Sequence, residues 1–235
     1  MSRSPTKFIG VDLAWKCDPS PNSITAICEC DAQGKVSSPV IVGSDEEILG
    51  SIPSPRDCWL AIDAPLQVPN QFGMREAERG VVHAGIHILP SNQDFLKRKC
   101  GGIRGERLAM ELVENGFQND AKGIQGSGLI YEVYPFGILH GITGGRVPRY
   151  KHGPMDGRRS ALHQVLNAVE GWEPSISSLD IFANEIDDAG PRQIREMGDK
   201  IDSMLCAICL YAHWLYAGER TRLFGDGSDG YILLV

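Results

Sequence analysis

The segment FIGVDLAW, at residues 8–15, decides the fold because it places a carboxylate inside a run that otherwise has the composition of a buried β-strand. Phe8, Ile9 and Val11 are residue types enriched in strands, and no turn signal stands beside Asp12. A buried carboxylate loses its hydration, so it needs a charged or hydrogen-bonding partner. Asp12 therefore indicates a functional site on this strand.

Two further strand-like runs follow. SITAICEC, at residues 23–30, is separated from the first run by KCDPSPN, and KVSSPVIVG, at residues 35–43, follows the turn-like DAQG. These runs predict a three-stranded antiparallel meander. Pro39 has no N–H to donate to a ladder, so the third strand is expected at a sheet edge.

A helix and two more strands complete the predicted sheet. SDEEILGSI, at residues 44–52, begins with a capping Ser and carries acids in its first turn, and CWLAIDAP, at residues 58–65, ends at Pro65. A strand–helix–strand connection favours parallel pairing, here with the first strand. LIYEVYPFGIL, at residues 129–139, predicts a fifth strand. We expect an α/β fold with a mixed five-stranded sheet of order 3-2-1-4-5 and flanking helices.

The rest of the chain is predicted to be helical or irregular. Residues 70–128 have helical and loop-like patterns and are interpreted as an insertion after strand four. No linker is long enough to separate two domains, so one domain is expected over residues 1–235. The apolar segment at residues 197–218 predicts a long final helix buried against the sheet, and GYILLV predicts a short terminal strand.

Five carboxylates stand where these elements would meet. Asp63 ends strand four, and Asp199 and Asp202 lie three residues apart in the expected first turn of the last helix, on one face. Crowded carboxylates take up protons unless a cation neutralises them, and hard divalent ions suit oxygen ligands. Two such ions about 4 Å apart can support phosphodiester hydrolysis. The predicted catalytic residues are Asp12, Asp63, Glu132, Asp199 and Asp202, with Asp12, Asp63 and Asp202 as ligands of Mg²⁺ or Mn²⁺.

Some of these acids also have a purely structural interpretation. Asp199 can cap the last helix, and Asp63 can bond the turn before Pro65. Glu132 can pair with a nearby arginine. Asp12 has no comparable alternative, because it stands within an apolar strand.

Basic residues gather in two segments. FLKRKCGGIRGERL, at residues 95–108, suits either phosphate contact or an ordinary solvated surface. Residues 140–159, after strand five, would leave the sheet at the same end as Glu132, which favours a phosphate role there. The candidate substrate-binding residues are Arg104, Arg146, Arg149, Lys151 and Arg158.

Composition limits the setting and the partners. A net charge of −7 over 235 residues argues against a surface that coats long nucleic acid. A short, single-stranded or branched nucleic acid, or a phosphorylated small molecule, is the expected partner. No segment has the length or pattern of a signal peptide or membrane span, so we expect a cytoplasmic protein without a membrane partner. The seven scattered cysteines predict reduced core thiols, and His83 and His87 are expected to be structural.

Five motifs, in this order along the chain, carry a resemblance: FIGVDLAW, AIDAPL, EVYP, YKHG and DKIDSMLCA. They resemble a family of predicted ribonuclease H-like nucleases, catalogued as domain of unknown function family 429. The resemblance runs from near residue 7 to the C-terminus and implies a ribonuclease H-like fold with an acidic metal site at Asp12, Asp63, Glu132 and Asp202. The pair Asp199 and Asp202 is similar to the resolvase branch of that superfamily, although the strand-four acid there is typically Glu and here is Asp63.

Three classes of function follow from the sequence. The first is metal-dependent phosphodiester hydrolysis at the acid cluster. The second is a phosphotransferase related to sugar kinases and actin-like ATPases, which would need a Gly-rich hairpin that DLAWKCDPSPN lacks. The third is a non-catalytic binding module with residual acids.

Overall fold

A five-stranded mixed sheet forms the centre of the computed structural model, which describes residues 5–17, 24–119, 123, 124 and 126–235. The strand order is β3-β2-β1-β4-β5, as the sequence predicts. β1 pairs antiparallel with β2, and β2 with β3, whereas β1–β4 and β4–β5 are parallel. The strands are β1 (Lys7–Asp12), β2 (Thr25–Asp31), β3 (Val40–Val42), β4 (Cys58–Ile62) and β5 (Ile130–Glu132).

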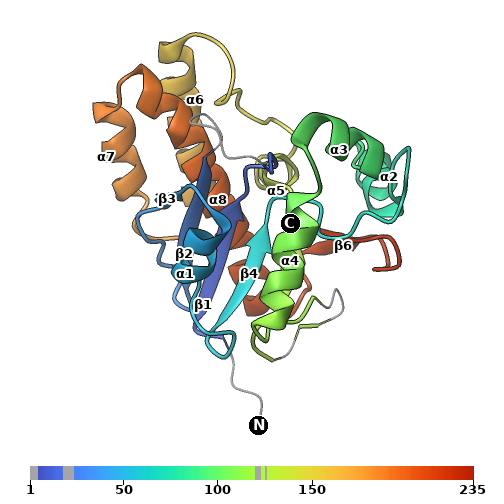
Figure 1. The fold of residues 1–235 in the computed structure, drawn as a ribbon. Coiled ribbons are helices and arrows are strands. Elements are labelled where there is room, and N and C mark those ends of the chain that lie inside the picture. Colours follow the sequence, from blue (N-terminus) through green and yellow to red (C-terminus); the bar gives the residue numbers. More distant parts are fainter. Residues whose placement is uncertain (1–4, 18–23, 120–122, 125) are drawn as a thin grey trace.

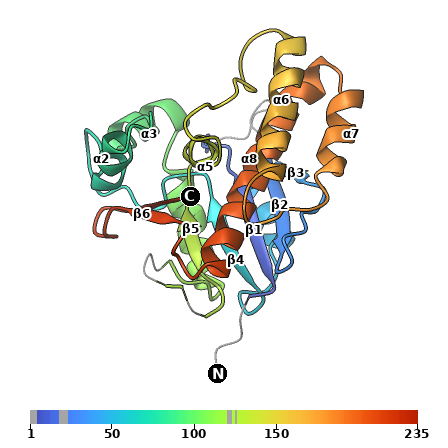
Figure 2. The same cartoon turned by 180° about the vertical axis from the view of Figure 1, so that it is seen from behind.

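Helices cover both faces of the sheet (Figures 1 and 2). α8 lies on one face, and α1 and α4 lie on the other. Figure 1 shows α6 and α7 on one flank of the molecule, α2 and α3 on the opposite flank, and α5 between them. The helices are α1 (Asp45–Ser51), α2 (Glu76–His83), α3 (Gln93–Cys100), α4 (Arg104–Glu114), α5 (Pro135–Ile142), α6 (Met155–Glu170), α7 (Asp180–Asp188) and α8 (Pro191–Leu215).

Alternating residues of β1 supply two separate cores. Phe8 packs with α8 and the neighbouring strands on one face, while Ile9 and Val11 pack with α4 on the other. Burial on both faces explains why residues 8–11 of the strand carry no polar side chain. Three helices, α2, α3 and α4, lie within the expected insertion, and α4 closes the second core through Leu108 and Leu112.

Two elements have different bounds from those that the sequence suggests. β5 is short, and the segment expected to continue it becomes α5, which starts at Pro135 because proline is favoured in the first turn of a helix. The last helix starts at Pro191, where the Gln193 side chain accepts a bond from Gly190 N at 2.7 Å. Asp199 and Asp202 therefore lie well inside α8, and the predicted first-turn position is wrong.

The sheet edges match the sequence in part. β3 is the edge strand that Pro39 predicts, but it is confined to Val40–Val42. Ser44 caps α1 by accepting a bond from Glu47 N at 3.2 Å. The terminal strand is present as β7 (Ile232–Leu234), and it pairs with β6 (Arg222–Phe224), which the sequence analysis did not predict.

Two expectations concern segments outside the sheet. Most of the turn expected at residues 16–22 falls at residues 18–22, outside the described residues. Within the described chain, none of the helices combines the length and apolar character needed to cross a membrane.

Candidate active site

Three carboxylates meet at one end of the sheet. Asp12 is the last residue of β1, and Asp63 directly follows β4, where its N–H donates to Val11 O at 2.9 Å. Asp202 reaches the same place from α8. One ligand oxygen from each carboxylate lies within 4.8 Å of the others. The structure therefore brings together the three residues that the sequence suggests as metal ligands.

Sheet register and close helix packing account for this meeting. Val11 pairs with Ile62 in the parallel β1–β4 ladder, so the next residues, Asp12 and Asp63, are adjacent and face α8. A Cβ at Gly10 would lie 2.0 Å from Ser203 O. Only glycine admits the α8 backbone so close to β1, and this contact sets Asp202 against Asp12.

Lys151 binds the acid cluster from the loop between α5 and α6. Its Nζ lies 3.5 Å from an Asp12 oxygen and 3.0 Å from an Asp199 oxygen, and it also contacts Asp202. The Tyr150 hydroxyl donates to the other Asp202 oxygen. Asp199 thus joins the site through Lys151. The Lys151 ammonium, expected to contact a substrate phosphate, is held by carboxylates instead.

Burial and mutual repulsion raise the pKa values of the three carboxylates, and the nearby positive charge does not offset this effect. Burial raises the pKa of Asp12 well above its usual range, opposed by Lys151 and reinforced by Asp202 and Asp63. Burial and then Asp202 raise the pKa of Asp63 to about 8. Burial also raises the pKa of Asp202, against the effect of Lys151. One ammonium among Asp12, Asp63, Asp199 and Asp202 therefore does not neutralise the cluster.

A cavity of about 690 Å³ opens beside these acids. Asp63 and Asp202 line it together with Lys151. The start of α5 and the loop that follows α5 supply the rest of its wall, and the residues there include Tyr134, Phe136, Arg149, Tyr150 and His152. The cavity gives a substrate access to the carboxylates.

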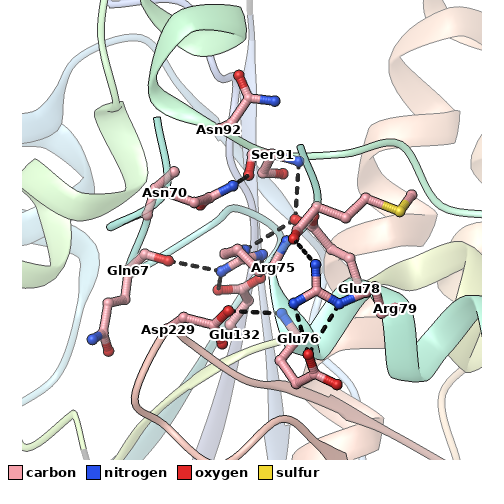
Figure 3. Close-up of polar contacts among 12 residues, drawn as sticks. Gln67, Asn70, Arg75, Glu76, Glu78, Arg79, Ser91, Asn92, Glu132 and Asp229 are labelled. Atoms are coloured by element: carbon pink, nitrogen blue, oxygen red, sulfur yellow. Dashed lines mark hydrogen bonds and ion pairs between the residues drawn. The ribbon is translucent and has the colours of Figure 1, made fainter. Parts of the chain in front are cut away.

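Glu132 belongs to a different cluster (Figure 3). Arg75 donates to both of its carboxylate oxygens and, through Nε, to Glu78 at 2.9 Å. Leu66 N also donates to Glu132 at 2.9 Å, and all three charged side chains are almost wholly buried. Burial raises the pKa of Glu132, against the effect of Arg75. The structure therefore supports the arginine-paired interpretation of Glu132, and the predicted catalytic role is not supported by its position.

Side-chain alternation gives the physical reason. Glu132 pairs in register with Ile62, so it faces the side of the sheet that carries α4. Asp63, one residue later on β4, faces α8. A one-residue difference in register therefore separates the two carboxylates.

The predicted substrate-binding residues differ in their exposure to solvent and in their partners. Arg104 is buried and donates to Asp45 at 2.8 Å and to Ala14 O at 2.7 Å, so its predicted phosphate role is not supported. Arg158 is partly exposed and donates to Gly153 O at 3.0 Å. Arg146 and Arg149 are exposed, and Arg149 lines the cavity.

Sequence reasoning missed Tyr150, His152 and the two aromatic residues at the start of α5. The available signal was the motif YKHG, which holds Tyr150, Lys151 and His152 together. Other candidate ligands lead to no further metal site: within the described residues, Asp12, Asp63 and Asp202 form the one group of three or more potential ligands. All seven cysteines are free thiols, and five of them are buried, as predicted.

Comparison with known proteins gives one match. The profile described as "Protein of unknown function (DUF429)" matches residues 10–228. Curated proteins and solved structures give no match. The matched range contains every residue of the acid cluster and covers nearly the whole chain, and the protein therefore belongs to the DUF429 family.

Proposed function

We propose that the protein is a metal-dependent hydrolase of phosphodiesters that binds Mg²⁺ or Mn²⁺ through Asp12, Asp63 and Asp202. The observation that carries this proposal is the meeting of three carboxylates, within 4.8 Å of one another, at the carboxyl end of two adjacent parallel strands. Two of them, Asp63 and Asp202, line a cavity of about 690 Å³, which supports a catalytic role over a closed structural site.

The residues present suit a hard divalent cation. Carboxylate oxygens are the ligands that Mg²⁺ and Mn²⁺ prefer. The Lys151 ammonium already lies between Asp12, Asp199 and Asp202, so a positive charge is accommodated there. A divalent ion would supply the charge that the cluster lacks, and it would lower the pKa of a bound water and stabilise the leaving oxygen.

The chain's own groups would hold and position the substrate. Asp199 lies one helical turn from Asp202 and is placed to orient a water or to keep Lys151 in position. Arg149 faces the cavity, and no carboxylate of the described residues pairs with it. Its guanidinium is available to a phosphate oxygen.

The topology supports assignment to the ribonuclease H-like group. An antiparallel meander β3-β2-β1, followed by parallel β4 and β5, is the order expected for that fold. Acids on β1, after β4 and on the last helix are three of the positions that the resemblance implies. The fourth, Glu132 on β5, is paired with Arg75. The proposed substrate is a short or single-stranded nucleic acid or a phosphorylated small molecule, and the proposed location is the cytoplasm.

Calorimetric titration with Mn²⁺ and Mg²⁺, followed by cleavage of labelled single-stranded and branched oligonucleotides, tests the proposal. Wild type should bind metal and cleave, and Asp12→Asn should do neither. Asp156→Asn, at an exposed position on α6, is the matched control and should behave like wild type. Absence of metal binding by the wild type would exclude the proposed chemistry.

A further inference from the structure

The cavity beside the acid cluster has an aromatic wall that hydrolysis of a phosphodiester alone does not require. Tyr134 precedes α5 and Phe136 lies in its first turn, and their ring centroids are 5.9 Å apart with planes inclined by 38°. Both residues line the cavity. The Tyr134 hydroxyl donates to His87 O at 3.1 Å, which fixes that ring against the insertion.

Phe136 is a large apolar side chain that is exposed at the start of α5. It keeps 36% of its surface exposed, while the neighbouring Pro135, Gly137 and Ile138 are buried in the core. Its exposed surface borders the cavity that holds Asp63 and Asp202. A flat, solvent-facing ring beside a reactive site is a suitable surface for stacking a planar ligand group.

Another part of the cavity wall carries basic side chains. Residues 143–154, between α5 and α6, contain Arg146, Arg149 and Lys151 and no acidic residue. Arg149 and His152 line the cavity, and neither side chain has an ion-pair partner among the described residues. One cavity therefore combines an aromatic wall, a basic wall and the acid cluster.

We propose that this cavity binds one nucleotide unit with an unpaired base, with the base stacked on Phe136 and Tyr134 and its phosphate between Arg149 and the acid cluster. A base within a duplex has both faces covered by its neighbours, so a duplex does not present this surface. The protein's net charge of −7 also disfavours a long duplex. This inference rests on the proposed hydrolysis, which identifies the reacting bond as a phosphodiester, and it adds the class of substrate that carries this bond.

Binding to a short single-stranded oligonucleotide that carries 2-aminopurine tests the proposal, because stacking on an aromatic ring quenches this fluorescent base. Titrations in EDTA, and again with Ca²⁺, measure binding without requiring hydrolysis. Phe136→Ala should weaken binding about 10-fold, within the range known for base–aromatic stacking, and Phe136→Tyr should retain it. Phe72→Ala removes an exposed ring from the insertion, outside the cavity, and should have no effect.

Competition identifies the recognised group and its source. AMP should displace the probe at least about 10-fold better than ribose 5-phosphate, because only AMP offers a base to stack. A single strand that binds much more tightly than AMP would identify a strand as the natural ligand, and equal affinities would identify a free nucleotide. A duplex of the same sequence should not compete.

Three results would overturn the proposal: no quenching in either buffer, equal binding by wild type and Phe136→Ala, or equal competition by AMP and ribose 5-phosphate. The last two would leave phosphodiester hydrolysis standing with another substrate. Conversely, base-dependent binding by a protein that binds neither Mg²⁺ nor Mn²⁺ would support the nucleotide site and refute the proposed hydrolysis.

Discussion

Replacing Asp63 by Asn should make the metal-free protein more stable at alkaline pH and leave its stability almost unchanged at acidic pH. The pKa of Asp63 is raised from 3.8 to about 8, chiefly by burial. The folded state therefore holds a proton that the unfolded chain releases. The stability contributed by this carboxyl is complete below pH 4, falls between pH 4 and 8 and is absent above that range.

The size of the effect follows from the displacement of the pKa. A change of about 4 pH units corresponds to an upper limit of ~6 kcal/mol. Asp63 lines the cavity and interacts electrostatically with Asp12, Asp202 and Lys151. Screening by solvent and coupling between these groups reduce the net change in the free energy of unfolding. We expect the stability of Asp63→Asn to exceed that of wild type by about 2–3 kcal/mol at pH 9, and by less than about 1 kcal/mol at pH 5, where the loss has only begun.

Urea unfolding in EDTA at pH 5 and pH 9 measures this difference, with Asp156→Asn as the control that should show none. Added Mg²⁺ should reverse the order at pH 9, because metal binding stabilises only the folded wild type. If Asp63→Asn were less stable than wild type at pH 9 without metal, Asp63 would be a satisfied structural carboxylate. The acid cluster would then not lack positive charge.

Three further predictions concern the surroundings of the site. Gly10→Ala should lower the free energy of unfolding by about 1–3 kcal/mol and weaken Mn²⁺ binding in calorimetry, because its Cβ would meet Ser203 O at 2.0 Å and displace α8. Unchanged Mn²⁺ affinity would show that the close contact does not position Asp202. Glu132→Gln should destabilise the protein by about 3 kcal/mol in urea unfolding, because it leaves Arg75 with less buried counter-charge, yet Mn²⁺ affinity should stay within about 2-fold. A large loss of affinity would return Glu132 to the metal site. Lys151→Met should lower the melting temperature in EDTA and enlarge its increase on adding Mg²⁺, because Lys151 is the cation that contacts three of the acids. A smaller rise in melting temperature on adding Mg²⁺ than in wild type would show that Lys151 assists metal binding instead of occupying the place of the metal.

The sequence was sufficient for the sheet because its signals are local. Strand composition, Pro39 at an edge and the helix between β3 and β4 together restrict the order to the one observed. Asp12 and Asp63 follow from the same reasoning, since adjacent parallel strands end at one edge of a sheet. Their meeting depends on strand order more than on side-chain detail.

The environments of Glu132 and Arg104 depend on contacts between distant segments. Glu132 differs from Asp63 by one residue of register, and register is decided by packing that a single strand does not reveal. The pairing of Arg75 with Glu132 joins residues 57 apart in the sequence. Arg104 likewise pairs with Asp45, 59 residues away, which the local sequence does not reveal.

The carboxylate in the apolar strand is explained by what the other elements bring to it. Gly10 allows α8 to reach β1, α8 contributes Asp199 and Asp202, and the loop after α5 contributes Lys151. This internal ammonium contacts Asp12, Asp199 and Asp202, so the cluster can assemble before any ligand binds. The ion pairs of Lys151 do not include Asp63, whose pKa burial raises to about 8. Asp63 lines the cavity and is therefore open to a cation that enters from solvent.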